Sequence, residues 1–157
     1  MVSVAEAQTY IDSWYAAFPG AKEYFDRQEQ EVIREQGFQT LLGRYRRLPT
    51  VNSSNREERS KELRQARNRM LCDASDILII VMLLIEHDPE LKELFVQMLL
   101  QIHDELVLEA PDNTEILWKA TERIKYLMEH GLELVGINFS VPLTVEGSFA
   151  YSWGQAK

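Results

Sequence analysis

Residues 96–110 read VQMLLQIHDELVLEA, and this stretch decides the fold. Two apolar runs flank three polar residues, His103, Asp104 and Glu105. Apolar runs of this length, joined by a short polar break, are typical of two buried strands and their turn. The stretch therefore predicts a hairpin with an acid pair at its tip. The expected strands are residues 96–102 and 106–110.

The acid pair raises a question of chemistry. A carboxylate at a tight turn is held rigidly with its oxygens facing outward, which suits a hard divalent cation such as Mg²⁺. Neighbours in an extended hairpin point to opposite faces, so Asp104 and Glu105 do not both face one pair of ions. Two-metal phosphoryl transfer needs carboxylates from different elements. Asp104 therefore needs a distant partner, and the tripeptide taken alone is more often a plain polar turn.

Helical patterns precede the hairpin. Ser3 and Glu6 form a capping box that opens a helix over 4–17, and Pro19 opens a second helix that Gly37 is placed to end. Residues 38–54 lack a helical period and predict short extended pieces and a loop. A long helix is expected over 56–87, with a charged first half and an apolar second half.

After the hairpin, a helix is expected over 114–130, ended by Gly131. The tail over 141–153 predicts a strand and an aromatic end. Neither the start of the chain nor the apolar run over 77–85 has the features of a secretory signal or a bilayer-spanning helix. A soluble, cytoplasmic protein without membrane contact is therefore expected. Its 157 residues suit one domain or a piece of a larger one.

The net charge of −8 argues against binding of nucleic acid, but the charges are unevenly distributed along the chain. Residues 44–69 hold nine basic side chains against three acidic ones. A basic segment on an acidic body can bind phosphate, although a solvated helix face is the alternative. Cys72 has apolar neighbours and is expected to be a small core residue without a catalytic role.

Four stretches, in chain order, resemble family A DNA polymerases, the bacterial DNA polymerase I type. LLQIHDELVLEAP, residues 99–111, looks like the palm hairpin of the family's third motif, and YFDRQEQEVIREQGFQTLLGRYRRLP, residues 24–49, looks like a family helix and its Gly-Arg-x-Arg loop. The next family segment is similar to SSN at 53–55 together with the helix that follows it. The family's C-terminal strand and Trp-containing end resemble PLTVEGSFAYSWGQAK at 142–157. The similarity runs from about residue 4 to 157.

The resemblance implies an α+β fold: a partial polymerase palm, made of the hairpin and a C-terminal strand, packed with long helices and completed by a partner chain. It implies a fingers/palm junction over 1–54 and a palm segment over 55–157. Asp104 matches the aspartate that binds the catalytic metals, two Mg²⁺ ions shared with the partner. His103 matches a histidine near the primer terminus, and Glu105 matches a less essential acid.

The resemblance also implies DNA contacts. Arg64 and Asn68 lie one helical turn apart and match residues that contact the primer-template at its minor groove. The three arginines of the Gly-Arg-x-Arg stretch are expected at backbone phosphates. They are Arg44, Arg46 and Arg47.

Two departures from the family pattern set further expectations. RMLCDASD, residues 69–76, replaces the family's Gln-Gly stretch, which puts one minor-groove check of the new base pair in doubt. Nothing in the sequence resembles the first palm motif or the nucleotide-binding fingers helix. The chain is therefore expected to be inactive alone, as the C-terminal subunit of a split polymerase joined by a second polypeptide that binds dNTP, an arrangement that suits a phage genome. The alternatives are a non-catalytic DNA-binding or regulatory relic, and an excerpt of a longer polymerase.

Overall fold

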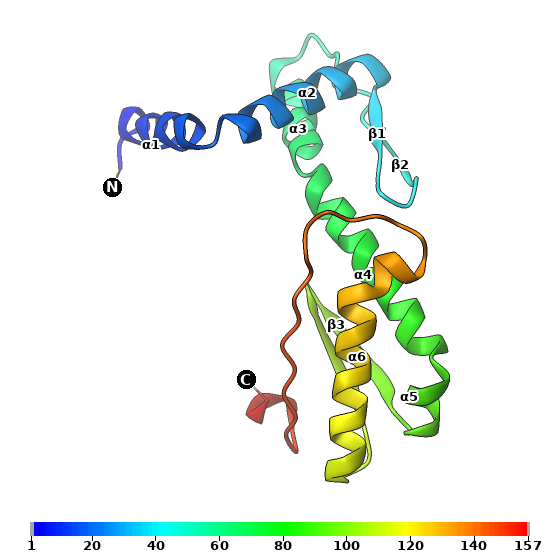
Figure 1. Cartoon of the computed structure of the whole chain (residues 1–157). Helices are drawn as coiled ribbons and strands as arrows, with labels where there is room; N and C mark the ends of the chain where they lie inside the picture. Colours follow the sequence, from blue (N-terminus) through cyan, green and yellow to red (C-terminus); the bar gives the residue numbers. More distant parts are fainter. Residues whose placement is uncertain (1, 157) are drawn as a thin grey trace. The chain divides into compact units, whose positions relative to one another are not determined.

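The computed structural model describes residues 2–156 and divides after Asp73 into an N-terminal unit and a C-terminal unit (Figure 1). The division follows the packing of the chain. The boundary predicted between residues 54 and 55 is of another kind, because it separates polymerase subdomains and not packed units. It stays a prediction. Each unit is described by itself below.

The N-terminal unit opens with the two predicted helices, α1 (Val4–Ala17) and α2 (Pro19–Glu35). Ser3 caps α1 with the expected box: its backbone N–H donates to the Glu6 carboxylate at 2.8 Å, and its hydroxyl accepts from the Glu6 backbone N–H at 3.2 Å. Pro19 occupies the first turn of α2, where a missing N–H costs nothing. Both helix predictions are confirmed.

Gly37 has a different role from the predicted helix cap. The residue that leaves α2 in the left-handed region is Gln36, with φ of 53°. A Cβ added at Gly37 would collide with the backbone carbonyl oxygen of Arg46 and lie 2.6 Å from the Tyr45 hydroxyl. Glycine is therefore required because another strand passes close by, and not because of the helix end.

That strand belongs to a small hairpin, β1 (Gly37–Gln39) and β2 (Tyr45–Arg47), which pair antiparallel. Phe38 of β1 is buried, and the core around it joins residues from α2, the hairpin, the following loop and the next helix. Leu63 and Cys72 pack against this core, as expected for Cys72. The buried core residues are Val32, Phe38, Leu48, Val51 and Ala66.

The long helix predicted over 56–87 is in fact two helices, α3 (Arg56–Arg67) and α4 (Arg69–His87). Asn68 separates them with φ of −82° and ψ of 8°, and its N–H bonds to the Gln65 carbonyl at 3.1 Å in a tightened last turn. Asparagine competes with the helix for backbone hydrogen bonds and favours caps, so the single-helix prediction was wrong at this residue.

The C-terminal unit continues with α5 (Pro89–Glu93), strands β3 (Gln97–Ile102) and β4 (Glu105–Glu109), and α6 (Thr114–Leu134). The hairpin prediction is confirmed. Met98, Leu106 and Leu108 of the hairpin pack against the core of this unit. That core is formed by Val81, Ile85, Leu91, Ala120 and Leu127.

Helix α6 runs past the stop predicted at Gly131. A Cβ there would lie 3.1 Å from Val81 and 3.2 Å from Leu84, so Gly131 lets α6 approach α4. The helix ends at Leu134 and is followed by Gly136, which has φ of 78°. The Gly136 N–H bonds to the Glu133 carbonyl, and the Ile137 N–H bonds to the Leu132 carbonyl. These two bonds form the Schellman arrangement.

The strand predicted over 141–153 is absent from the described residues. The tail is irregular and ends in a short 3₁₀ helix, η1 (Trp153–Gln155). Its Val145 N–H donates to a side chain, Glu129, rather than to a strand. The fold is α+β as predicted, but the β structure of residues 2–156 consists of two separate two-stranded hairpins. Over residues 2–156, no helix is long and apolar enough to cross a membrane.

Candidate active-site hairpin and nucleic-acid interface

The hairpin of the C-terminal unit places the acid pair at its tip. Ile102 faces Glu105 across the ladder, so His103 and Asp104 form a two-residue turn. His103 takes φ of 56°, the left-handed geometry that tight hairpin turns need. Farther from the tip the register shifts between Met98 and Leu100, which marks a bulge that bends the strand.

The two acids of the tip have different surroundings. Asp104 is exposed, and its carboxylate has no hydrogen-bond or ion-pair partner in the part of the chain that the structure describes. Glu105 accepts a hydrogen bond from the Trp153 indole Nε1, 2.8 Å away. Asp104 is therefore the carboxylate with both oxygens available to a ligand.

The donor set around Asp104 fits only part of a metal site. Its hard carboxylate oxygens are the ligands that Mg²⁺ prefers. Across residues 2–156, however, no three His, Cys, Asp or Glu side chains gather where they could hold a metal ion. A complete site would need at least one carboxylate from elsewhere, as the sequence predicted.

His103 presents an exposed side chain at the same turn. Its backbone carbonyl accepts a hydrogen bond from the Gln101 side-chain amide at 2.6 Å. The bond ties the turn to the strand that precedes it. The His103 side chain is therefore open to solvent on a turn that is bonded to the preceding strand.

A second aspartate of this unit, Asp88, has the opposite environment. It is only 5% exposed and accepts hydrogen bonds from Arg123 Nη2 at 2.6 Å and from the Leu91 backbone N–H at 3.0 Å. Burial alone raises the pKa of Asp88, but these hydrogen bonds outweigh it, and the pKa lies below its ordinary value. This ion pair joins the start of α5 to α6 and has a structural role.

In the N-terminal unit, the predicted phosphate-binding arginines lie on the β1–β2 hairpin, and all are exposed. Arg44 ends the turn. Arg46 lies opposite Phe38 in the ladder and donates to the Gln65 side chain of α3 at 2.8 Å. Because side chains alternate along a strand, Arg47 points to the other face. The three arginines therefore line both faces of one hairpin.

The predicted minor-groove residues lie at the end of α3. Arg64 and Asn68 are both exposed, one helical turn apart, as the spacing predicted. Arg64 makes no hydrogen bond or ion pair with any other described residue. Its guanidinium is available to a ligand.

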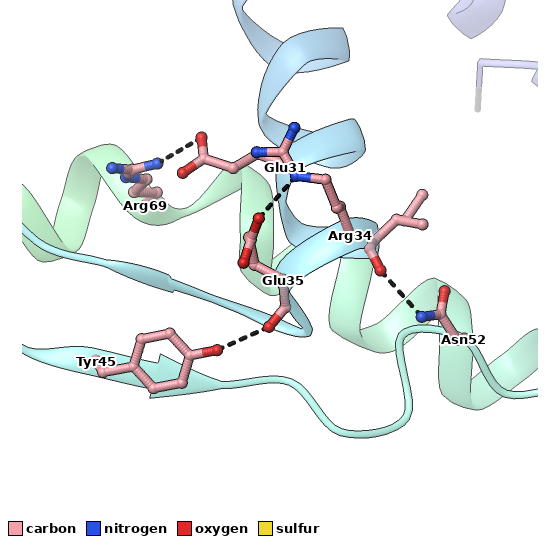
Figure 2. Close-up of polar contacts among 7 residues, drawn as sticks. Glu31, Arg34, Glu35, Tyr45, Asn52 and Arg69 are labelled. Atoms are coloured by element: carbon pink, nitrogen blue, oxygen red, sulfur yellow. Dashed lines mark hydrogen bonds and ion pairs between the residues drawn. The ribbon is translucent and has the colours of Figure 1, made fainter.

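Other basic side chains of the run bind acids of the same unit. Arg67 donates to Glu29 of α2 at 2.6 Å, and Arg69 pairs with Glu31 at 3.1 Å. Figure 2 shows the Arg69–Glu31 pair beside the contact of Arg34 with Glu35. The local positive charge is therefore smaller than the count over residues 44–69 suggests, because acids of α2 neutralise part of it. The sequence did not reveal which acids lie beside this basic run.

Three comparisons with known proteins agree on the family. The model of DNA polymerase family A matches residues 1–155. The chain therefore belongs to DNA polymerase family A. It is 36% identical to DNA polymerase I of Streptococcus pneumoniae serotype 4, over 99% of this chain and 17% of that protein. It is 35% identical to DNA polymerase I of Deinococcus radiodurans, over 99% of this chain and 16% of that protein.

A solved structure gives the same result for the fold. The POL domain of Pol1 from M. smegmatis, in complex with DNA primer-template and dNTP, matches with a TM-score of 0.87 and 27% identity. The match covers 99% of this chain and 26% of that one. The chain thus spans about a sixth of the length of the curated relatives named here.

Sequence reasoning missed Trp153 as a neighbour of the hairpin. The tail was expected to form a strand, and in a strand the pairing with a neighbouring strand would determine where the Trp153 side chain lies. No signal in the sequence links Trp153 to Glu105, 48 positions earlier. The contact depends on the path that the tail takes along the C-terminal unit.

Proposed function

We propose that this chain supplies the metal-binding hairpin and part of the primer-template surface of a family A DNA polymerase. In this proposal Asp104 is a ligand of catalytic Mg²⁺, His103 lies near the primer terminus, and Glu105 is an accessory acid. The observation that carries the proposal is the Asp104 carboxylate, exposed on a two-residue turn with no partner within residues 2–156. A divalent metal ion bound by Asp104 would neutralise charge during nucleotidyl transfer to the primer 3′ end.

The proposed DNA contacts are of two kinds. Arg44, Arg46 and Arg47 provide exposed guanidinium groups on a hairpin, a form suited to backbone phosphate, which carries little sequence information. Arg64, in the last turn of α3, and Asn68, the C-cap of that helix, provide a guanidinium donor and an amide suited to base edges in the minor groove. Binding through both kinds of contact is expected to depend on salt.

We propose that groups beyond the described residues complete the catalytic site and that a second polypeptide brings them. Asp104 alone does not hold two metal ions. The chain also exposes apolar side chains that a larger assembly would cover. In the N-terminal unit α1 has no buried residue, and Tyr10 is 68% exposed. In the C-terminal unit Leu99 and Leu100 of β3 are about half exposed.

The test is recovery of the tagged chain from its native lysate, followed by primer extension on the eluate. Asp104→Ala is compared with wild type. Asp112→Ala is the matched control, because Asp112 is exposed and precedes α6, away from the hairpin tip. We expect extension with wild type and with Asp112→Ala, and a loss on the order of 10³-fold or more with Asp104→Ala.

The same second polypeptide should be recovered with wild type and with both variants, because Asp104 and Asp112 are exposed and lie outside the cores. Extension by the Asp104→Ala eluate would contradict the catalytic role. DNA binding that persists in such an eluate would then favour the alternative, a non-catalytic DNA-binding or regulatory relic. Recovery of active polymerase without any other chain would contradict the two-polypeptide arrangement and would leave the proposed role of Asp104 unaffected.

A further inference from the structure

The C-terminal tail lies along α6 in the direction opposite to that helix. The first contact is near the end of α6, where the Val145 backbone N–H donates to Glu129 at 2.9 Å. The next lies near its start, where Phe149 meets Trp118 edge to face, with ring centroids 5.6 Å apart. The tail, orange to red in Figure 1, runs down beside the hairpin and then turns back to the C-terminus.

Gly147 lies between these two contacts. A Cβ added there would be 3.1 Å from the Thr121 methyl group, so the tail backbone lies directly on α6. The tail is therefore tied to the helix at successive points, although it forms no strand.

Beyond α6 the tail reaches the hairpin tip. The Trp153 Nε1 donates to Glu105 Oε1 at 2.8 Å, and the Ser148 hydroxyl donates to the Ala156 carbonyl at 2.8 Å, which closes the end of the chain on itself. Indole nitrogen is a donor only, and its bond to a carboxylate is charge-assisted. Glu105 is thus held by a group that is itself anchored along α6.

We propose that Trp153 is a positioning residue of the polymerase site. It fixes Glu105, and through Glu105 it sets the orientation of the adjoining turn that carries Asp104. This inference rests on the proposed function. Its physical reason is that a two-stranded hairpin is only marginally stable by itself, so an exposed tip needs outside support. Small misplacements of reacting groups cost rate, up to about 10²-fold for 1 Å.

The contact is tested first without activity. The ¹⁵N-labelled chain has three indole N–H signals, from Trp14, Trp118 and Trp153, and Trp153→Phe identifies the last by its loss. Glu105→Ala removes the acceptor and leaves the indole in place. We expect it to shift the Trp153 signal and to leave the Trp14 signal unchanged. A Trp153 signal that does not move would overturn the proposal.

The second test uses the reconstituted polymerase. Trp153→Phe keeps an aromatic ring but loses the donor, and should lower kcat by about tenfold and raise the Mg²⁺ concentration needed for half-maximal rate. The KM for primer-template should stay within about twofold, because the DNA-binding arginines are unchanged. A loss of bulk structure would instead lower the midpoint of thermal unfolding, which is measured in parallel.

Trp118→Phe is the matched control, because Trp118 meets the tail through its ring and not through its nitrogen. It should keep kcat within about twofold of wild type. Wild-type kcat and Mg²⁺ dependence in Trp153→Phe would overturn the positioning role, while an inactive Asp104→Ala would leave the proposed function standing. Activity in Asp104→Ala would overturn both.

Discussion

The two hairpins of this chain are built on opposite plans. In the N-terminal unit the strands β1 and β2 have three residues each, and the turn between them is tied down by Asp73, which accepts from the Leu41 backbone N–H at 2.8 Å. In the C-terminal unit β3 and β4 have six and five residues, and the turn is short and exposed. The turn of the first hairpin is held by a neighbouring side chain, whereas the second hairpin packs its strands on the core of its unit and leaves its turn exposed.

The roots of the hairpins differ in the same way. Tyr45 of β2 donates its hydroxyl hydrogen to the Glu35 carbonyl at 2.8 Å, and the loop after β2 is held by Asn52, which donates to the Ile33 carbonyl at 3.0 Å (Figure 2). Asp88 and Arg123 hold the segment that leads into β3. The surface proposed for DNA phosphates is held by several side-chain contacts, while Asp104, the group proposed for chemistry, has no partner among residues 2–156.

The largest expected effect is at the root of the first hairpin. Gly37→Ala places a Cβ against a backbone carbonyl, which cannot move aside as a flexible side chain can. We expect the free energy of unfolding to fall by about 3 kcal/mol, the upper range for overpacking. Urea unfolding of the chain measures this from the midpoint at constant slope.

Gly20→Ala is the control for this substitution. Gly20 lies in the first turn of α2, with no atom within 4 Å of an added Cβ. Alanine should stabilise the helix there, by up to about 1 kcal/mol. If Gly20→Ala lowered the free energy of unfolding as much as Gly37→Ala, the close approach of β2 to Gly37 would not explain the effect at Gly37.

The next effect is at the root of the second hairpin. Asp88→Ala removes both the cap of α5 and the partner of Arg123, whose pKa the Asp88 hydrogen bond raises. We expect a loss of about 2 kcal/mol at neutral pH, from a lost cap and a lost charged hydrogen bond. Glu115→Ala, at an exposed i,i+4 pair, should cost less than about 0.5 kcal/mol.

The pH dependence of this effect follows from the pKa of Asp88. Its folded pKa is lowered, so the stabilisation is present above the unfolded pKa of about 3.9 and is lost as pH falls through the folded pKa. The difference between wild type and Asp88→Ala should therefore be constant from pH 7 to about pH 5 and shrink below about pH 4. A difference that persists unchanged in stronger acid would contradict the ion-pair explanation.

The smallest effect concerns the charge on the first hairpin. Arg47→Ala should weaken binding of a fluorescent primer-template by about 1 kcal/mol and reduce the salt slope by about one. Arg34→Ala is the control, because Arg34 is exposed but pairs with Glu35 at 2.7 Å. Equal losses at both positions would show that the hairpin is not a specific part of the DNA surface.

Local patterns predicted most of the fold because they act over a few residues. Ser3, Pro19 and the alternation of apolar runs around His103 placed two helices and a hairpin correctly. The errors occurred where a distant contact or a single cap decided the outcome. Gly131 was predicted to end a helix, but it lies inside α6 and makes room for α4. One helix was predicted across Asn68, but Asn68 is the C-cap that separates α3 from α4.

By itself the sequence determined the hairpin, its acidic turn and the resemblance to family A polymerases, since turn chemistry and apolar spacing are local. The roles of Asp104 and of the arginines stay proposals. Only the tertiary structure decided that Asp88 and Arg67 are paired within their own units, while Asp104 has no partner in the part of the chain that the structure describes. It also brought Trp153 to Glu105. Pairing of a charged group depends on which segments pack beside it, and residue order does not state that.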